Sequence, residues 1–191
     1  MFLTRDEINK IGFKSVGSNV LISDKAVFYR PERISIGNNV RIDDFCVLAN
    51  NIVLHNYIHI ALYTCLLSGP NSVIEMKDFS GLAYRVLILT TSDNYSGLAM
   101  TNPTIPDKYR LGTEESITIG RHCVIGAGSI VLPGANLAEG VSVSAMSLVT
   151  KPTQEWKFYA GIPARIIQER KRDLLNLERE FMKNIKFEGK I

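Results

Sequence analysis

Aliphatic residues recur at every sixth position along most of the chain. From Ile119 the sequence divides into IGRHCV, IGAGSI, VLPGAN, LAEGVS and VSAMSL, followed by VTKPTQ. An earlier series begins at Ile36 as IGNNVR, IDDFCV, LANNIV, LHNYIH, IALYTC and LLSGPN, and it resumes from Met76 after four extra residues, SVIE. A period of six fits neither an amphipathic helix nor a simple alternating strand, whose periods are about 3.6 and 2.

A short strand followed by a turn does fit this period. The aliphatic first position then points into a shared interior, and the fifth position, which reads Cys, Ser, Ala, Val and Ser from Ile119 onward, stays small or β-branched. Gly, Asn and Asp between them supply turn conformations. Coils of such units pair strand upon strand, so the pattern predicts an all-β fold, a parallel β-helix in which no repeat is stable alone. A run of ordinary β-hairpins is the alternative, and the two long unbroken series disfavour it.

The same pattern divides the chain into segments of one domain, residues 1–191. We expect N-terminal coils over 16–89, an extended excursion loop over 90–116, C-terminal coils over 117–154, and a cap with a C-terminal α-helix over 155–191. Apolar residues fall at helical spacing near the end of the chain, and Trp156, Phe158 and Tyr159 are expected to close the open core. The helical positions are Ile167, Leu174, Leu177, Phe181 and Ile185.

Composition narrows the function without identifying it. The chain has 191 residues, 46% hydrophobic and 21% charged, with a net charge of +3, which is ordinary for one globular domain. We expect neither nucleic-acid binding nor membrane insertion, and a cytoplasmic location. The three cysteines lack CxxC spacing, which argues against a disulfide framework and a structural zinc site. Cys46 and Cys123 occupy fifth positions and should point inward, so an acyl-cysteine intermediate is not expected.

The run from Ile119 to Lys151 followed by YAGIPARII resembles the hexapeptide-repeat acyltransferases, and the likeness extends over about Val16 to Lys171. HIALYT, SDNYSG, TNPTIP and SAMSLV are most similar to the N-acyltransferases of nucleotide-linked 4-amino-4,6-dideoxy sugars, of the anthrose-pathway type. The resemblance implies a left-handed parallel β-helix with three hexapeptides per coil, and a homotrimer with active sites at subunit interfaces. It also implies acetyl-CoA or another short acyl-CoA as co-substrate, no metal, and a role in cell-surface polysaccharide biosynthesis.

The excursion after Asp93 interrupts the repeat, and in this family the excursion reaches a neighbouring subunit and forms the acceptor side of the site. Galactoside- and maltose-type members carry a general-base histidine at the same distance, where this chain has Asp93. An alcohol needs such a base, whereas about a tenth of an amine with a pKa near 8 is already neutral at pH 7. A carboxylate can orient that amine and stabilise its developing charge. Asp93 is therefore predicted to be catalytic; the alternative is an aspartate that only shapes a turn.

Further acceptor-side candidates follow from position. His59 lies on the preceding coil and is predicted to bind the sugar or relay a proton, with a solvated surface histidine as the alternative. Tyr84, Asn94 and Tyr95 are predicted to bind the substrate, or alternatively to fill subunit contacts. On the donor side, backbone N–H groups around Gly128, Ser144 and Ala145 are expected along the pantetheine arm and at the oxyanion.

Lys151 and Arg165 match the family's positions for the coenzyme's phosphates, although surface cations are often merely solvated.

Two other functions share the predicted fold. A sugar or xenobiotic O-acetyltransferase is disfavoured because no histidine occurs between His59 and His122. A zinc hydratase needs three histidines that converge across a subunit interface, and His55, His59 and His122 do not have its spacing. A purely structural β-helix would leave the excursion and AGIPARII without a purpose. The acyl group, the sugar and the nucleotide stay open at this stage.

Overall fold

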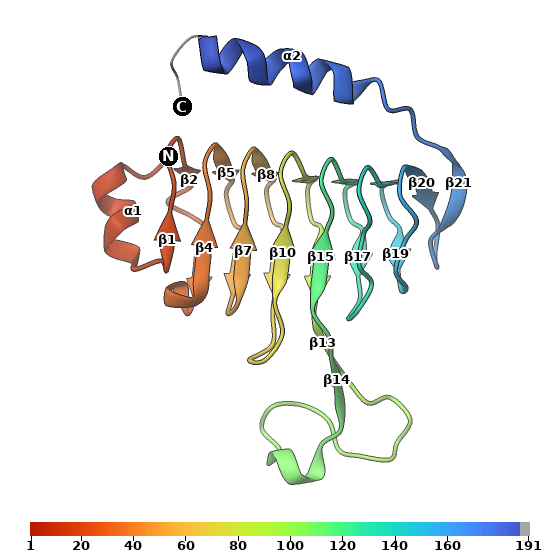
Figure 1. The fold of residues 1–191 in the computed structure, drawn as a ribbon. Helices are drawn as coiled ribbons and strands as arrows, with labels where there is room; N and C mark the ends of the chain where they lie inside the picture. Colours follow the sequence, from red (N-terminus) through yellow and green to blue (C-terminus); the bar gives the residue numbers. More distant parts are fainter. Residues whose placement is uncertain (188–191) are drawn as a thin grey trace.

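The computed structural model describes residues 1–187, and the side chains of residues 1–184. The chain winds into a parallel β-helix, as predicted, in which successive coils add strands to three sheets (Figure 1). The first sheet contains β1 (Ser15–Val16), β4 (Ile34–Ile36), β7 (Ile52–Leu54), β10 (Ile74–Met76) and β15 (Ile117–Ile119). The third contains β3 (Val27–Tyr29), β6 (Val47–Ala49), β9 (Cys65–Leu67), β12 (Leu87–Leu89), β17 (Ile130–Val131) and β19 (Leu148–Val149).

The second sheet is the longest because the chain returns to it at the end. It contains β2 (Leu21–Ile22), β5 (Val40–Ile42), β8 (Ile58–Ile60), β11 (Gly81–Leu82), β16 (Val124–Ile125), β18 (Ser142–Val143), β20 (Lys157–Ala160) and the antiparallel edge strand β21 (Arg165–Glu169). A separate antiparallel ribbon joins β13 (Thr91–Asp93) to β14 (Gly112–Glu114). The helices are α1 (Arg5–Ile11), α2 (Leu174–Phe187) and the 3₁₀ turns η1 (Pro31–Arg33) and η2 (Asp107–Tyr109).

The turns between sheets stack into three ridges. The first ridge joins the first sheet to the second, the second ridge joins the second sheet to the third, and the third ridge joins the third sheet back to the first. Backbone hydrogen bonds between coils hold equivalent positions one above another, as in the 3.0 Å bond from Val47 N to Thr64 O. Each coil therefore advances along the axis by about one strand spacing, ~4.8 Å.

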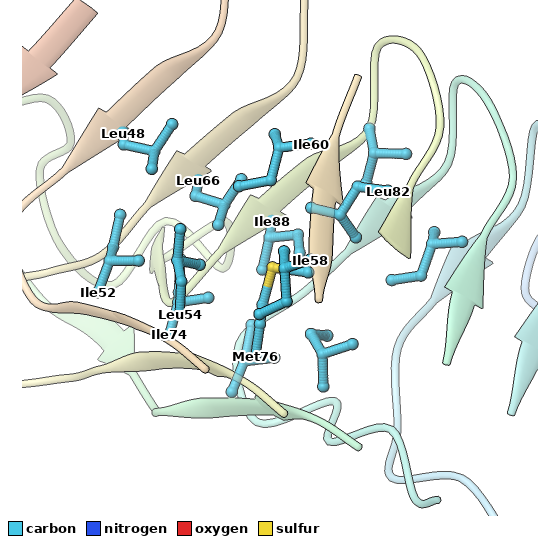
Figure 2. Packing of buried hydrophobic residues seen from close by; sticks show 14 of the residues in the cluster. Leu48, Ile52, Leu54, Ile58, Ile60, Leu66, Ile74, Met76, Leu82 and Ile88 are labelled. Atoms are coloured by element: carbon cyan, nitrogen blue, oxygen red, sulfur yellow. The ribbon is translucent and has the colours of Figure 1, made fainter. Parts of the chain in front are cut away.

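The six-residue period corresponds to the buried positions, as predicted. The small fifth positions from Ile119 onward are all buried: Cys123, Ser129, Ala135, Val141 and Ser147. Figure 2 shows aliphatic side chains such as Ile60, Leu66 and Leu82 pointing from different sheets into one interior. Burying each such side chain contributes roughly 1.5–3 kcal/mol, so the core stabilises the stack along its whole length.

The four extra residues do not lie where the sequence division put them. The division treats 72–75 as extra, but Ile74 is fully buried and pairs with Ile52 of the coil below. The insertion instead occupies the turn between Leu67 and Ile74, on the third ridge. The physical reason is that Ile74 belongs in the core, whereas the preceding Gly, Pro, Asn and Ser residues suit a turn.

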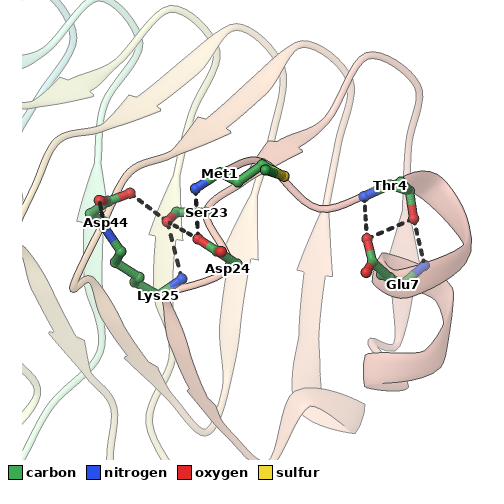
Figure 3. A network of polar contacts seen from close by, with 7 residues as sticks. All are labelled: Met1, Thr4, Glu7, Ser23, Asp24, Lys25 and Asp44. Atoms are coloured by element: carbon green, nitrogen blue, oxygen red, sulfur yellow. Dashed lines mark hydrogen bonds and ion pairs between the residues drawn. The ribbon is translucent and has the colours of Figure 1, made fainter.

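Both ends of the β-helix are covered. The N-terminal helix α1 was not predicted, although Thr4 and Glu7 form a capping box and Gly12 ends the helix at a positive φ of 83° (Figure 3). Ile8 from α1 lies in the core. Figure 3 also shows the Met1 amino group bonded to Asp24, which ties the N-terminus to the first coil.

The C-terminal helix begins later than predicted. Ile167 lies in β21 because residues 165–169 pair with β20, and α2 starts only at Leu174. From there α2 runs back over the second sheet (Figure 1), where Phe181 contacts the rings of Tyr57 and Phe79 edge-on. Glu178 accepts hydrogen bonds from Arg121 and from His122. The side chain of Ile185 lies outside the described residues.

Trp156 and Tyr159 are buried at the last coil, as expected of a cap. Gly140 makes this possible, since a Cβ there would lie 2.4 Å from the Trp156 ring.

We predict that Gly140→Ala lowers the free energy of unfolding by about 2–4 kcal/mol, from overpacking added to left-handed backbone strain. Gly97→Ala is the matched control, because Gly97 also has a positive φ but nothing within 4 Å of its Cβ. Urea denaturation measures both variants, and equal losses would contradict the packing role.

Candidate functional site

The excursion leaves the third ridge after Thr90. Its neck is the β13–β14 ribbon, in which Thr91 pairs with Glu114 and Asp93 pairs with Gly112. Beyond the neck, the chain forms an arm that projects away from the coils (Figure 1). Apolar side chains on this arm are exposed, namely Tyr95, Leu98, Met100, Tyr109 and Leu111. The arm therefore presents an apolar surface that its own chain does not bury.

Asp93 stands at the outer end of this ribbon and is exposed. Its Oδ2 atom accepts one long hydrogen bond, 3.3 Å from the N–H of Asn102. The local turn is instead made by Asn94, whose side-chain oxygen accepts from the Ser96 N–H at 2.8 Å. Asn94 thus performs the turn-shaping role that the sequence left open for Asp93, and the Asp93 carboxylate keeps most of its hydrogen-bonding capacity for another partner. Tyr95, 91% exposed, follows directly on the arm.

His59 lies in β8 of the second sheet, away from the ribbon that carries Asp93. Its Nε2 atom is 2.7 Å from Asp43 Oδ2, and Arg41 donates to Asp43 Oδ1 at 2.7 Å. Asp43 is only 4% exposed. Burial favours its neutral form, yet the hydrogen bonds from Arg41 and His59 hold the pKa of Asp43 below its usual value. The imidazole is therefore oriented by a buried carboxylate.

The His59 ring borders a cavity of about 530 Å³ between α2 and the second sheet, among the aromatic side chains of Tyr57, Phe79 and Phe181. Helix α2 lies on the opposite side of the coils from the excursion (Figure 1). One chain therefore does not bring His59 to Asp93, and any joint role needs a second subunit.

The three histidines do not converge within one chain. His55 bonds to Glu75, His59 to Asp43 and His122 to Glu178, at 2.7–2.8 Å. Among residues 1–187 the structure forms no group of three or more His, Cys, Asp or Glu side chains that could hold a metal ion. The ligand set that a zinc hydratase requires is thus not assembled inside a subunit.

Cys46 and Cys123 point inward, as expected from their fifth positions. Burial raises the pKa of Cys46 to about 11 and that of Cys123 to about 12. Both thiols donate to backbone carbonyls, of Ala61 and Ala138 respectively. Neither thiol is a nucleophile at neutral pH.

A second cavity, of about 410 Å³, lies where the coils end and brings Lys151 and Arg165 together. Tyr159, Ala164 and Ile166 complete its apolar wall. Two cations beside an apolar wall suit a ligand that carries phosphates and an organic body. Lys151 lies on the third ridge, two coils beyond the excursion, which corresponds to a separation along the axis of about 10 Å.

The other predicted donor-side residues lie on the second ridge. The N–H of Gly128 donates to Tyr84 O at 2.9 Å, and that of Ser144 donates to Tyr159 O at 2.8 Å. Coil stacking thus already uses these two groups, whereas the N–H of Ala145 donates to no acceptor among the described residues. Of these three residues, Ala145 alone keeps a backbone N–H that can donate to a ligand.

Eight of the predicted residues consequently form two separate groups, whereas His59 and Arg165 lie in β8 and β21 of the second sheet. Asp93, Asn94, Tyr95 and Lys151 belong to the third ridge, whereas Tyr84, Gly128, Ser144 and Ala145 belong to the second ridge. The third sheet separates these two ridges along the whole stack. A site that uses both groups needs two subunits.

One polar residue on the ribbon that carries Asp93 was not predicted from the sequence. Glu114, at the base of β14, accepts hydrogen bonds from the loop at Asn71 and Ser72. A signal was present, since the four extra residues and the excursion interrupt successive turns of the same ridge.

Comparisons of sequence and structure show which known proteins this chain resembles. No protein-family model matches it. It is 43% identical over 183 residues to a dTDP-4-amino-4,6-dideoxy-D-glucose acyltransferase of Escherichia coli, covering 94% of each chain. The structure of AntD, an N-acyltransferase from Bacillus cereus, in complex with dTDP and 3-hydroxybutyryl-CoA superposes with a TM-score of 0.95 at 45% identity, covering 97% of this chain and 98% of that one. A serine-to-alanine variant of AntD with dTDP-4-amino-4,6-dideoxyglucose and coenzyme A gives 0.92 at 46% identity, covering 96% and 98%.

The buried Asp43 carboxylate gives a pH-dependent prediction. Its pKa is lowered in the folded state, so its contribution to stability is present above the unfolded pKa near 3.9 and is lost as the pH falls through the folded pKa. Asp43→Asn should therefore be less stable than wild type by about 1–2 kcal/mol at pH 7, and the difference should be smaller at pH 3, below the unfolded pKa. Denaturant titrations at both pH values measure this.

Asp107→Asn is the control, because Asp107 is 93% exposed and its removal should change stability little at either pH. A deficit in Asp43→Asn that stayed constant with pH would show that the charge of Asp43 is not what stabilises the fold.

Proposed function

We propose that this chain, which belongs to the family of acyl-CoA-dependent N-acyltransferases of nucleotide-linked amino-deoxy sugars, acylates the 4-amino group of dTDP-4-amino-4,6-dideoxyglucose. The observation that supports this most is likeness over nearly the whole chain to two proteins named for that chemistry. The donor is acetyl-CoA or a short acyl-CoA such as 3-hydroxybutyryl-CoA, which AntD binds. The product is a sugar amide for cell-surface polysaccharide, made in the cytoplasm where acyl-CoA is available.

The reaction is a direct transfer. The neutral amine attacks the thioester carbonyl, the nitrogen–carbon bond forms, and the carbon–sulfur bond breaks as coenzyme A leaves. The nitrogen loses one proton, and the departing thiolate gains one. Asp93 accepts a hydrogen bond from the amine, aims its lone pair at the carbonyl and stabilises the positive charge that develops on nitrogen. The exposed, lightly bonded carboxylate of Asp93 is consistent with this role.

The donor then lies along the third ridge. Lys151 and Arg165 hold the phosphates in the cavity at the end of the coils, and the pantetheine arm extends along the axis towards Asp93. The separation of about 10 Å between the Lys151 turn and the excursion suits an extended arm. The free N–H of Ala145, on the second ridge of a neighbouring subunit, lies on the same coil as Lys151 and can donate to the pantetheine arm.

The assembly that joins the two ridges is a homotrimer. In a ring, each subunit makes the same head-to-tail contact, so the third ridge of one copy faces the second ridge of the next. The apolar arm supports this arrangement, because its exposed Tyr95, Leu98 and Met100 need a surface to cover them. Each trimer then has three equivalent sites, each with Asp93 from one subunit and Tyr84 from another.

A thiol-release assay tests the proposed function. Acetyl-CoA and 3-hydroxybutyryl-CoA are each supplied with dTDP-4-amino-4,6-dideoxyglucose, with the corresponding 3-amino sugar nucleotide, or with dTDP-glucose, which has no amine. We expect coenzyme A release with the 4-amino sugar and none with dTDP-glucose. Release with dTDP-glucose alone would favour O-acylation and contradict the proposal.

Asp93→Asn tests the catalytic role. The amide keeps the size of the side chain but loses the charge, so turnover should fall by about 10²-fold while the melting temperature stays within a few degrees of wild type. Raising the pH should recover only part of the loss, because it supplies neutral amine but not its orientation. Asp107→Asn, on the same excursion, is the control and should keep normal turnover. Near-normal turnover in Asp93→Asn would remove Asp93 from the reaction.

A further inference from the structure

One carboxylate ties the neck of the excursion to the neighbouring loop. Glu114 Oε1 accepts hydrogen bonds from the N–H of Asn71 at 2.7 Å, the N–H of Ser72 at 2.9 Å and the hydroxyl of Ser72 at 2.9 Å. Asn71 and Ser72 belong to the turn that contains the four extra residues, between β9 and β10. The inserted loop therefore supplies three donors to a residue that lies 42 positions further along the chain.

The network continues into the β-helix. The hydroxyl oxygens of Ser72 and Thr90 are 2.6 Å apart, and Thr90 Oγ1 accepts from the N–H of Gly69 at 2.7 Å. Ser72 and Thr90 are almost fully buried. A consistent set of donors runs from Gly69 to Thr90, from Thr90 to Ser72, and from Ser72 to Glu114. The last residue of the coil, the loop and the ribbon are thus joined by one chain of hydrogen bonds.

The loop also packs too closely for any side chain at Gly69. A Cβ there would lie 2.2 Å from Glu114 Oε1 and 2.5 Å from the methyl carbon of Thr91. Glu114 is an exposed residue, and although partial desolvation of its carboxylate favours the neutral form, the hydrogen bonds from Asn71 and Ser72 hold its pKa below the usual value. The group is then an anion at neutral pH, and its hydrogen bonds are charge-assisted.

The position of the Glu114 carboxylate matters because the same ribbon carries Asp93. Glu114 pairs with Thr91, and Asp93 lies two residues further out on the same strand as Thr91, about 7 Å from the base. Without a side-chain anchor, a ribbon of two strands can tilt at its base, where Glu115 N bonds to Thr90 O. A tilt of about 10° would move Asp93 by about 1 Å, and a displacement of that size can cost about 10²-fold in rate.

We propose that Glu114 is a positioning residue of the acceptor site, which locks the ribbon so that Asp93 meets the amine. The proposal rests on the proposed function. It also gives the four extra residues a purpose: their turn supplies the donors that hold Glu114.

The test compares three variants. Glu114→Ala should lower turnover with the amino-sugar nucleotide by about 10-fold to 10²-fold, with an unchanged KM for acyl-CoA because the donor cavity lies two coils away. Glu114→Gln should recover most of this turnover, since its amide oxygen can accept the same three hydrogen bonds. Glu115→Ala is the matched control, because it removes the adjacent glutamate and should change neither quantity.

A second measurement needs no substrate. Trypsin can cut the arm after Lys108 and Arg110, and a released ribbon exposes these bonds more often. Cleavage there should be about tenfold faster in Glu114→Ala than in wild type, Glu114→Gln or Glu115→Ala. Ser72→Ala, which removes one of the three hydrogen bonds, should have a smaller effect in the same direction and replaces Glu114→Ala if that variant does not fold.

Normal turnover in Glu114→Ala, or faster cleavage without any loss of turnover, would overturn the positioning role. A raised KM for acyl-CoA together with lowered turnover would also overturn it, since that pattern indicates general damage. If the wild type itself acylates no amino sugar, the proposed function fails separately. Trypsin then decides whether Glu114 locks the ribbon: unchanged cleavage overturns the proposal, and faster cleavage reversed by Glu114→Gln supports it.

Discussion

The hydrogen bonds between coils are the interaction on which the rest of this structure depends. They force equivalent residues to stand one strand spacing apart, about 4.8 Å. The effect is visible on the first ridge, where the rings of Tyr57 and Phe79 stack at 4.7 Å and Phe79 and His122 stack at 5.3 Å. A side chain on a ridge is therefore placed by the whole stack, and the position of a functional group along the axis is set by the number of its coil.

This rigidity accounts for the placement of the proposed chemistry at an interruption of the coils. A regular coil uses its backbone donors for stacking, as Gly128 and Ser144 do, and it presents few free groups. The excursion leaves the stack through a two-stranded ribbon and carries Asp93 away from the ridge, towards space that a second subunit can fill. The cations Lys151 and Arg165 lie at the other place where stacking stops, the end of the coils. The number of regular coils between the excursion and the end of the stack therefore sets the distance between Asp93 and these two cations.

Much of this arrangement could be predicted from the sequence because the period is a local signal. Every aliphatic first position and small fifth position predicted from Ile119 is buried. The capping box at Thr4 and Glu7, which begins α1, is an equally local signal. The errors arose where two signals compete: Ile167 has helical spacing but pairs as a strand, and Ile74 was counted as an extra residue although it fills the core. The two interruptions of one ridge pointed to this region, but the role of Glu114 itself could not be predicted, because its partners are brought to it only by the register of stacking.

We expect each site to combine the third ridge of one subunit with the second ridge of another, and mixed trimers distinguish this arrangement from a site within one subunit. Asp93→Asn disables the third ridge, and Ala145→Trp blocks the second, at an exposed position. Trimers that contain both variants, co-expressed with different tags and purified through both, have one site in which both ridges are intact. If each site spans two subunits, such trimers should have about one third of wild-type turnover, although the trimers of either variant alone are nearly inactive. Turnover no higher than that of either variant alone would contradict this arrangement.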